Sequence, residues 1–263
     1  MSSTLHARGK PLLIQRIVDS LRRRYFARIN RVNSFRGVYS TFADAQRAAP
    51  RFKPLGYELA NSANWYRDKL NGISLEDYPM IYWLRDALES GRSIFEVGGH
   101  VGVAYYGFSK VLKYPPDLQW TICDVPSVVS AGENLAREQG RTNLRFIIHP
   151  TESEGADIVL AAGSLQYIDS PSLVEMIGAF RVRPRHVLIN ITPVYEGPSF
   201  VTLQYIGTAF CAYRIFNRTQ FVAEFEDAGF SLVDSWQKPR TTRIPGHREK
   251  SFDYYSGFYF RAA

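Results

Sequence analysis

The spacing of apolar positions changes about a third of the way along the chain. Before that point it is helical: in residues 11–32 apolar side chains return about every 3.6 positions with arginines between them, which predicts a basic amphipathic helix. A short helix is expected to begin with Ser40 or Thr41 as its N-cap and to end before Pro50, and a further helix is expected over residues 76–89. These patterns predict a helical N-terminal region with loops.

Beyond that region, short continuous apolar runs alternate with helical segments. The runs predict strands at residues 93–99, 119–125, 144–150, 156–164 and 185–194. Helices are expected at residues 103–114, 126–140, 170–181 and 219–230. Ser170 is the expected cap of the third helix. Strands that alternate with helices in this way predict a parallel sheet with helices on both faces, and thus an α/β fold.

Two stretches near the C-terminus depart from this alternation. Residues 195–217 are a looser aromatic stretch, which we expect to form an insertion on the substrate side of the sheet. Residues 231–237 and 256–262 predict two final strands, which flank a basic loop and can form an antiparallel pair. The expected organisation is a helical region over residues 1–90 and one α/β domain over residues 91–263.

Charge is concentrated at the N-terminus. The chain carries a formal net charge of +7, but residues 1–53 hold twelve Lys or Arg and two Asp, so the rest of the chain is slightly acidic. A basic amphipathic helix can pack on the body of the protein, pair with a second copy of the chain, or lie on an anionic membrane surface. A nucleic-acid partner is less favoured, because the basic excess lies outside the predicted α/β domain.

The apolar runs contain no membrane span, since none approaches the roughly 18–20 residues that a span needs. The N-terminal segment shows no small-residue cleavage site of a secretion signal. The two cysteines, Cys123 and Cys211, lack the spacing of a metal site, so we expect free thiols. The expected location is the cytoplasm, either free or at the inner face of the membrane through the N-terminal helix.

The turn after the first predicted strand reads FEVGGHVG, residues 95–102, and holds three glycines. Glycines at this place let a ligand approach the backbone. Their spacing departs from the G-x-G-x-x-G pattern of dinucleotide sites at two of three positions. Counted from Glu96, the turn matches the acidic-x-G-x-G-x-G pattern of S-adenosylmethionine (SAM) sites except at His100. We therefore favour SAM over a nicotinamide dinucleotide as the cofactor.

The next predicted strand ends in a second acidic residue. Asp124 lies 22 residues after Gly102 and is followed by Val125. A carboxylate can accept two hydrogen bonds at once, which suits the two hydroxyl groups of a ribose. We expect Asp124, with Val125 beside it, to bind the cofactor. The alternative is that Asp124 is only a turn residue or the cap of the helix that begins at Pro126.

These motifs together resemble those of class I SAM-dependent methyltransferases. FEVGGHVG, CDVPSVV and ADIVLAAGSLQYIDSP are similar to the motifs of small-molecule O-methyltransferases. Most of residues 35–260 also resembles a family of bacterial methyltransferases often encoded in surface-polysaccharide loci, which shares the segments RGVYSTFADA and YRIFNRTQF. The resemblance implies a Rossmann-like sheet of seven strands with the last one antiparallel. It also implies SAM contacts at Glu96, Gly98, Gly99, Gly102 and Asp124.

The candidate base is the histidine inside the glycine turn. An O-methyltransferase removes a hydroxyl proton as the methyl group transfers, so a base with a near-neutral pKa helps. In the O-methyltransferases that the motifs resemble, a histidine after the fourth strand does this, and the matching residue here is Gln166, which cannot act as a base. We expect His100 to serve as the base or to orient the acceptor; the alternative is that it only fixes the turn.

Aromatic residues gather where an acceptor would lie. A tyrosine combines a flat apolar ring with a hydroxyl group, which suits sugars and phenols. The sequence shows no cluster of metal ligands, so we expect no metal. The predicted substrate-binding residues are Tyr105, Tyr106, Gln166, Tyr167 and Tyr195.

The sequence thus predicts a SAM-dependent methyltransferase that acts on a hydroxyl group of a small molecule or glycan, for example a sugar of a surface glycan or of a lipid-linked precursor. Two other classes stay open. One is an RNA methyltransferase that binds its substrate through the arginine-rich region. This class predicts a steep salt dependence of RNA binding. The other is a non-catalytic scaffold of the same fold at a membrane surface, which predicts weak or absent cofactor binding.

Overall fold

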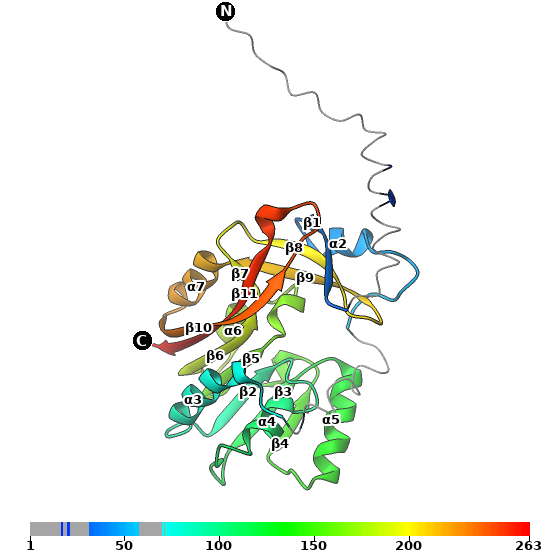
Figure 1. Ribbon diagram of the computed structural model, residues 1–263. Coiled ribbons are helices and arrows are strands. Elements are labelled where there is room, and N and C mark those ends of the chain that lie inside the picture. Colours follow the sequence, from blue (N-terminus) through cyan, green and yellow to red (C-terminus); the bar gives the residue numbers. More distant parts are fainter. Residues whose placement is uncertain (1–16, 18–19, 22–31, 58–69, 71) are drawn as a thin grey trace, which may run out of the picture.

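The computed structural model describes residues 17, 20–21, 32–57, 70 and 72–263. Two β-sheets dominate this part of the chain (Figure 1). The larger sheet has seven strands in the order β10-β11-β6-β5-β2-β3-β4, and the smaller has four in the order β1-β8-β9-β7. The predicted helix over residues 11–32 lies almost entirely outside the described residues, so its membrane and self-association roles stay predictions.

The seven-stranded sheet has the arrangement that the resemblance implied. Its five parallel strands are β2 (Ser93–Val97), β3 (Gln119–Cys123), β4 (Leu144–Ile147), β5 (Ile158–Ala162) and β6 (His186–Thr192). Two further strands, β10 (Phe230–Thr242) and β11 (Phe252–Ala262), complete one edge. Because β11 runs antiparallel to both β6 and β10, the prediction of a seven-stranded sheet with an antiparallel last strand is confirmed.

Helices cover both faces of this sheet, as predicted. One face packs against α3 (Tyr78–Ala87), α4 (Val103–Phe108) and α5 (Pro126–Glu138). The other packs against α6 (Leu173–Ala179) and α7 (Arg218–Asp227). No helix in the described part of the chain is long and apolar enough to cross a membrane.

The central strands are buried on both sides, which explains their continuous apolar runs. Successive side chains of a strand point to opposite faces. In β5, Ile158 and Leu160 join the core beneath α3, α4 and α5, whereas Val159 and Ala161 join the core beneath α6 and α7. A strand with two buried faces has no polar position to alternate with, so its sequence pattern is unbroken.

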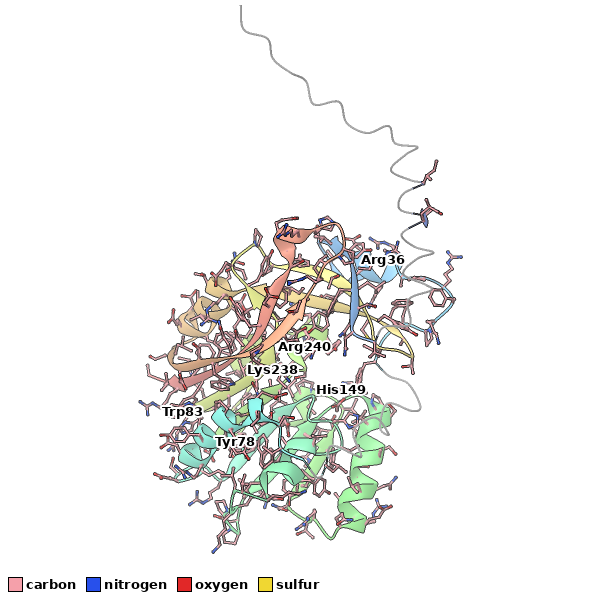
Figure 2. All side chains as sticks on the ribbon, viewed as in Figure 1. Arg36, Tyr78, Trp83, His149, Lys238 and Arg240 are labelled. Atoms are coloured by element: carbon pink, nitrogen blue, oxygen red, sulfur yellow. The ribbon has the colours of Figure 1, made fainter. Side chains whose placement is uncertain are left out.

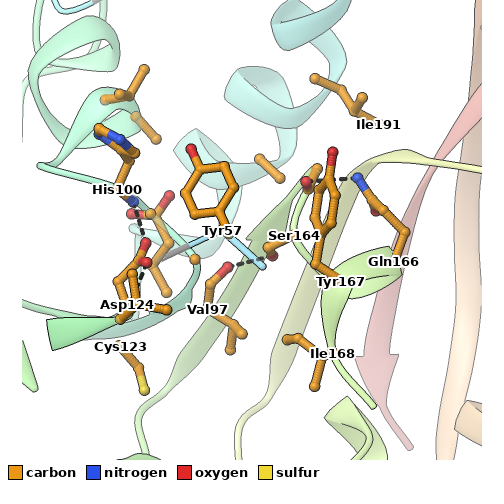
Figure 3. Close-up of a pocket in the computed structure, with 18 of the residues that line it drawn as sticks. Tyr57, Val97, His100, Cys123, Asp124, Ser164, Gln166, Tyr167, Ile168 and Ile191 are labelled. Carbon is orange, nitrogen blue, oxygen red and sulfur yellow. Dashed lines mark hydrogen bonds between the residues drawn. The ribbon is translucent and has the colours of Figure 1, made fainter. Parts of the chain in front are cut away.

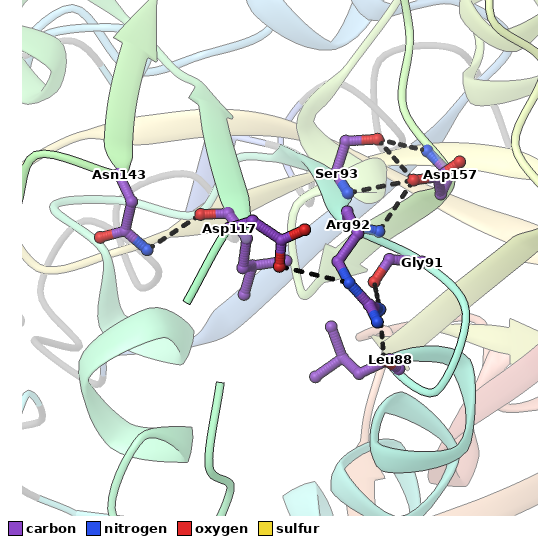
Figure 4. A network of polar contacts seen from close by, with 8 residues as sticks. Leu88, Gly91, Arg92, Ser93, Asp117, Asn143 and Asp157 are labelled. Carbon is purple, nitrogen blue, oxygen red and sulfur yellow. Dashed lines mark hydrogen bonds and ion pairs between the residues drawn. The ribbon is translucent and has the colours of Figure 1, made fainter. Parts of the chain in front are cut away.

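A polar network joins β2 to β5 at the amino ends of the parallel strands (Figure 4). Asp157 Oδ2 accepts hydrogen bonds from the backbone N–H groups of Arg92 (2.9 Å) and Ser93 (3.1 Å) and from Ser93 Oγ (2.9 Å). The Arg92 guanidinium donates in turn to the carbonyl groups of Leu88 and Gly91, which follow α3. The network fixes the start of β2 and thereby the place at which its carboxyl end emerges.

The N-terminal region is not purely helical. The helix α2 (Phe42–Arg47) begins after Thr41, whose side chain accepts a hydrogen bond from the backbone N–H of Asp44, so this predicted helix and its cap are confirmed. Just before it, β1 (Ser34–Tyr39) is a strand where only helices and loops were expected. Its partner, β8 (Phe200–Tyr205), lies far along the chain, so no local pattern reveals the pairing.

Residues 195–217, expected to be a loose insertion, form most of the smaller sheet. They contribute β8 and β9 (Phe210–Asn217), and β7 (Val194–Tyr195) begins just before them. The final strand pair is also longer than predicted. As a result, β10 and β11 extend beyond the larger sheet (Figure 1). Phe252 and Tyr255 of this extension pack with Tyr213 of the smaller sheet.

One predicted helix cap was wrong by two residues. Ser172, not Ser170, caps α6: its Oγ accepts a hydrogen bond from Glu175 N, and Glu175 Oε2 accepts one from Ser172 N. This reciprocal pair satisfies two backbone donors at the start of the helix. Two serines flank Pro171, and only the one three residues before a glutamate can form the pair.

Candidate functional site

A cleft of about 1010 Å³ lies at the carboxyl ends of β2, β3 and β5. Residues of the smaller sheet and of the β10–β11 hairpin line its other side. In open α/β sheets ligands bind at this position, where the connections of neighbouring strands depart to opposite faces. The volume stands at the upper end of the range for small-molecule pockets, so the cleft has room for a cofactor-sized ligand and a second small molecule.

The glycine turn between β2 and α4 forms one wall of the cleft. Gly98 (φ +69°), His100 (φ +55°) and Gly102 (φ +98°) all adopt positive φ, which is costly for any residue but glycine. At Gly98 a Cβ atom would lie 2.3 Å from Ser164 Cβ, so only glycine fits there. The Gly98 N–H donates to the Cys123 carbonyl (2.8 Å), which ties the turn to the end of β3.

Glu96 lies directly beneath this turn and is 2% exposed. A Cβ atom at Gly99 would lie 2.5 Å from the Glu96 carboxyl carbon, so the second glycine makes room for the carboxylate. Trp120 Nε1 donates to Glu96 Oε2 (2.8 Å). Burial raises the pKa of Glu96 to about 7 despite this hydrogen bond, and the charge of Asp124 contributes to the increase.

Asp124 follows β3 and faces the same cleft (Figure 3). Its Oδ2 accepts the backbone N–H of His100 (2.9 Å), and its Oδ1 accepts that of Val125 (2.8 Å). Burial raises the pKa of Asp124 to about 6, although these two hydrogen bonds oppose the increase. Each carboxylate oxygen keeps a further lone pair, so Asp124 can still accept two hydrogen bonds from a ligand.

Asp124 does not cap α5, which was one of the two alternative roles for it. The N-cap of α5 is Val125, and no side chain there bonds to the first turn. Asp124 instead holds the glycine turn through the His100 N–H. The structure therefore leaves its carboxylate at the cleft.

Most of the predicted site residues come together at this cleft. The lining includes Glu96, Gly98, Gly99, His100, Asp124, Val125, Gln166 and Tyr167. Gly102 does not line it but precedes α4 in a left-handed conformation. In the described part of the chain, no group of three or more His, Cys, Asp or Glu could hold a metal ion.

Three of the predicted substrate-binding tyrosines do not reach the cleft. Tyr105 and Tyr106 lie on α4, and their rings pack in the core beneath the sheet, where Tyr105 OH donates to Asn143 Oδ1 (2.7 Å). Tyr195 packs in the core of the smaller sheet, and its hydroxyl donates to the Pro198 carbonyl (2.6 Å). An amphipathic ring fits a core and a ligand site equally well, so the sequence could not separate the two.

Gln166 and Tyr167 line the cleft after β5. Gln166 is 3% exposed; its Nε2 donates to the Gly163 carbonyl (2.6 Å), whereas its Oε1 has no hydrogen-bond partner among the described residues. Tyr167 OH donates to Gln204 Oε1 (2.7 Å) of β8. A buried amide oxygen without a partner is costly in a folded protein, and a ligand that donates a hydrogen bond would satisfy it.

The structure adds residues to the site that the sequence did not single out. Tyr57 lies between His100 and Tyr167, with ring-centroid separations of 6.5 Å and 6.0 Å (Figure 3). The other additions lie mainly on β8, β10 and β11, and on the loop after β5: Ser164, Gln204, Lys238, Arg240 and Tyr255. Two of these residues, Lys238 and Arg240, could have been found from the sequence. They are two positions apart, so on a strand their side chains lie on the same face.

The sequence matches no protein-family model and no curated protein sequence. Solved structures nevertheless share the fold. One is the 1,6-didemethyltoxoflavin-N1-methyltransferase of Burkholderia thailandensis, solved with bound 1,6-didemethyltoxoflavin and S-adenosylhomocysteine (TM-score 0.50, 17% identity, 99% of this chain and 93% of that chain). Another is the N-terminal domain of EvdMO1 with S-adenosylhomocysteine bound (TM-score 0.51, 14% identity, 73% and 83%).

A third similar structure is an O-methyltransferase family protein from Burkholderia thailandensis (TM-score 0.50, 14% identity, covering 95% of this chain and 70% of that chain). At such low identities the likeness establishes the fold, which is that of SAM-dependent methyltransferases. The cleft described above lies at the ligand-binding edge of this fold.

Proposed function

We propose that the protein is a SAM-dependent methyltransferase. The observation that carries the proposal is the pair of carboxylates, the buried Glu96 and the half-buried Asp124, at the carboxyl ends of neighbouring parallel strands beside a glycine turn. We call this part of the cleft, residues 96–100 and 123–126, the cofactor end. Its donor and acceptor groups fit SAM, because a diol and a cationic group both favour a nearby carboxylate.

The residues of the cofactor end have separate roles in this proposal. Asp124 accepts hydrogen bonds from the two ribose hydroxyl groups. The backbone at Gly98 and Gly99 carries no side chains, which lets the cofactor approach. Glu96, held by Trp120, supplies negative charge beneath the turn. Bound SAM supplies an electrophilic methyl group, and the protein supplies position and charge.

The acceptor then occupies the opposite part of the cleft, which we call the acceptor end. It is lined by Gln166, Tyr167, Gln204, Tyr213, Lys238, Arg240 and Tyr255. The unsatisfied Gln166 Oε1 favours an acceptor that donates a hydrogen bond, such as a hydroxyl group of a small molecule or glycan unit. His100, which is buried at the cleft wall, is the proposed group that takes or orients the hydroxyl proton.

Calorimetric titration with S-adenosylhomocysteine tests the cofactor. We expect the wild-type protein to bind it and not to bind NAD, and we expect Asp124→Asn to weaken the binding about a hundredfold, because two charge-assisted hydrogen bonds are lost. Asp117→Asn is the matched control: Asp117 lies before the other end of β3, is exposed and pairs with Arg92. Absence of S-adenosylhomocysteine binding by the folded wild-type protein would reject the proposal and favour a non-catalytic scaffold.

A further inference from the structure

The two ends of the cleft differ in charge. The cofactor end holds the carboxylates of Glu96 and Asp124, and Glu76 and Asp77 bring two further carboxylates to the cleft lining, but the two cations of the described lining, Lys238 and Arg240 of β10, both lie at the acceptor end. Lys238 forms an ion pair with Glu76. No carboxylate among the described residues lies within ion-pair distance of Arg240. Arg240 is thus a cation of the lining whose charge no described carboxylate neutralises.

Arg240 is nevertheless held in place. Its guanidinium lies over the ring of Tyr255, 4.8 Å from the centroid, and the Tyr255 hydroxyl lies 2.9 Å from that of Tyr213. Figure 2 shows Lys238 and Arg240 one after the other along β10. Both are half-buried, and the intervening Pro239 is exposed, as the alternation of a strand requires. The strand therefore presents the guanidinium to the cleft on a stacked, rigid support.

We propose that Arg240 binds an anionic group of the methyl acceptor, a carboxylate or a phosphate, so that the substrate is an acidic small molecule or an acidic glycan unit. This inference rests on the function proposed above. A guanidinium presents its N–H donors in a planar fork that matches both oxyanions, and half-burial strengthens such a contact relative to one in open water.

The charge arrangement also determines how the acceptor is oriented in the cleft. An anion is repelled by the ionised carboxylates of Glu96 and Asp124 and attracted by Arg240. The anionic group of the acceptor therefore lies away from the cofactor end, which leaves its neutral hydroxyl group to face that end. A neutral acceptor of the same shape would have no such preference and would leave Arg240 without an anionic partner.

The test compares ligands that differ in charge but little in shape. Benzoate and benzamide have the same outline, and phenyl phosphate carries the other candidate oxyanion. Each is titrated by calorimetry into wild-type protein, Arg240→Gln, Arg240→Lys and the control Arg243→Gln, with and without S-adenosylhomocysteine. Arg243 carries the same charge on the segment that follows β10, but it is exposed, pairs with Asp253 and is not part of the cleft lining.

We expect at least one anion to bind the wild-type protein more tightly than benzamide does. We expect Arg240→Gln to weaken that anion at least about tenfold, as loss of a charged hydrogen-bond donor predicts, with a smaller loss in Arg240→Lys and none in Arg243→Gln. The tighter of benzoate and phenyl phosphate identifies the oxyanion. The same affinity for anion and amide, or an unchanged anion affinity in Arg240→Gln, overturns the inference.

Titration of the same proteins with S-adenosylhomocysteine separates the remaining outcomes. Arg240→Gln is expected to bind it as tightly as the wild-type protein does, which also shows that the cofactor end is intact. An equal loss of S-adenosylhomocysteine affinity would assign Arg240 to the carboxylate of the cofactor and overturn the inference. If the wild-type protein binds anions through Arg240 but never binds S-adenosylhomocysteine, the proposed function fails while the anion site stands.

Discussion

The two ends of the cleft are built in opposite ways. The cofactor end consists of two short segments of consecutive residues, and it keeps two features that destabilise the fold: carboxylates whose pKa values are raised by desolvation, and a non-glycine residue, His100, at positive φ. The acceptor end is assembled from strands far apart in the sequence, and most of its polar groups bond to one another, as Tyr167 does with Gln204 and Tyr213 with Tyr255. The cofactor end therefore carries most of the energetic cost of function, whereas the acceptor end, apart from Gln166 Oε1 and the Arg240 guanidinium, is a hydrogen-bonded wall.

Gly98→Ala should break the cofactor end most severely. The added Cβ combines a positive φ with an approach of 2.3 Å to Ser164 Cβ, so we expect a loss of about 2–4 kcal/mol in the free energy of unfolding and loss of S-adenosylhomocysteine binding. Gly178→Ala is the control, because nothing lies within 4 Å of its Cβ position in α6. We expect that change to be neutral or to stabilise by about 0.5–1 kcal/mol. Chemical denaturation and calorimetry measure both, and similar losses in the two variants would contradict the account of the turn.

Glu96→Gln should change stability and binding in opposite directions. At pH 8 the buried Glu96 is ionised at a cost that its raised pKa of about 7 reflects, so the neutral amide should stabilise the ligand-free protein by about 1–3 kcal/mol. The same change removes negative charge beneath the turn and should weaken S-adenosylhomocysteine at least about tenfold. Thermal unfolding and calorimetry at pH 8 report the two effects. A variant that is both less stable and a normal binder would contradict the assignment.

The pH dependence of S-adenosylhomocysteine binding should follow the same carboxylates. Their ionised forms bind the ligand, so affinity should rise with pH through about 6 for Asp124 and about 7 for Glu96 and level off above pH 8. The stability of the ligand-free protein has the opposite sign: both pKa values are higher in the folded state, so their contribution falls as pH rises from the ordinary carboxyl range to these values. Calorimetry from pH 5 to pH 8 tests this, since a flat affinity profile would exclude both groups.

Tyr213→Phe should produce the smallest of these effects, and it tests whether the two ends of the cleft act independently. The change removes a buried hydrogen bond to Tyr255, and we expect a loss of about 1 kcal/mol in the free energy of unfolding. Tyr255 retains a contact with Thr242 Oγ1 at 3.5 Å, which limits the loss. We expect no change in S-adenosylhomocysteine affinity. A tenfold change in that affinity would show that the two ends do not act independently.

The same contrast explains what the sequence could predict. The cofactor end could be located because its residues are contiguous and because Gly98 and Asp124 are demanded by local geometry and hydrogen bonding. The seven-stranded sheet could be predicted because strands with two buried faces leave an unbroken apolar pattern. These features depend on residues that are neighbours in the sequence or on the pattern within a single element.

The acceptor end could not be predicted to the same degree. Whether a tyrosine is enclosed in a core, as Tyr105 and Tyr195 are, or is partly exposed to the cleft, as Tyr167 is, depends on how elements far apart in the sequence pack together. The strand Ser34–Tyr39 was likewise missed, because its partner lies near the other end of the chain. A one-residue shift of register would exchange the faces of such strands, and local propensity does not determine it.

The long β10 strand has a consequence for protein engineering. Its first part is anchored in the larger sheet, and its last part carries Lys238 and Arg240 on the face that lines the cleft, while Gln237 and Pro239 point to solvent. Replacing positions 238 and 240 therefore leaves the anchoring pairs with β11 unchanged, since those pairs are made by the backbone. A library randomised at these two positions alone would sample new acceptor chemistries while the cofactor end stays unaltered. Redesign of acceptor specificity should therefore begin with this strand.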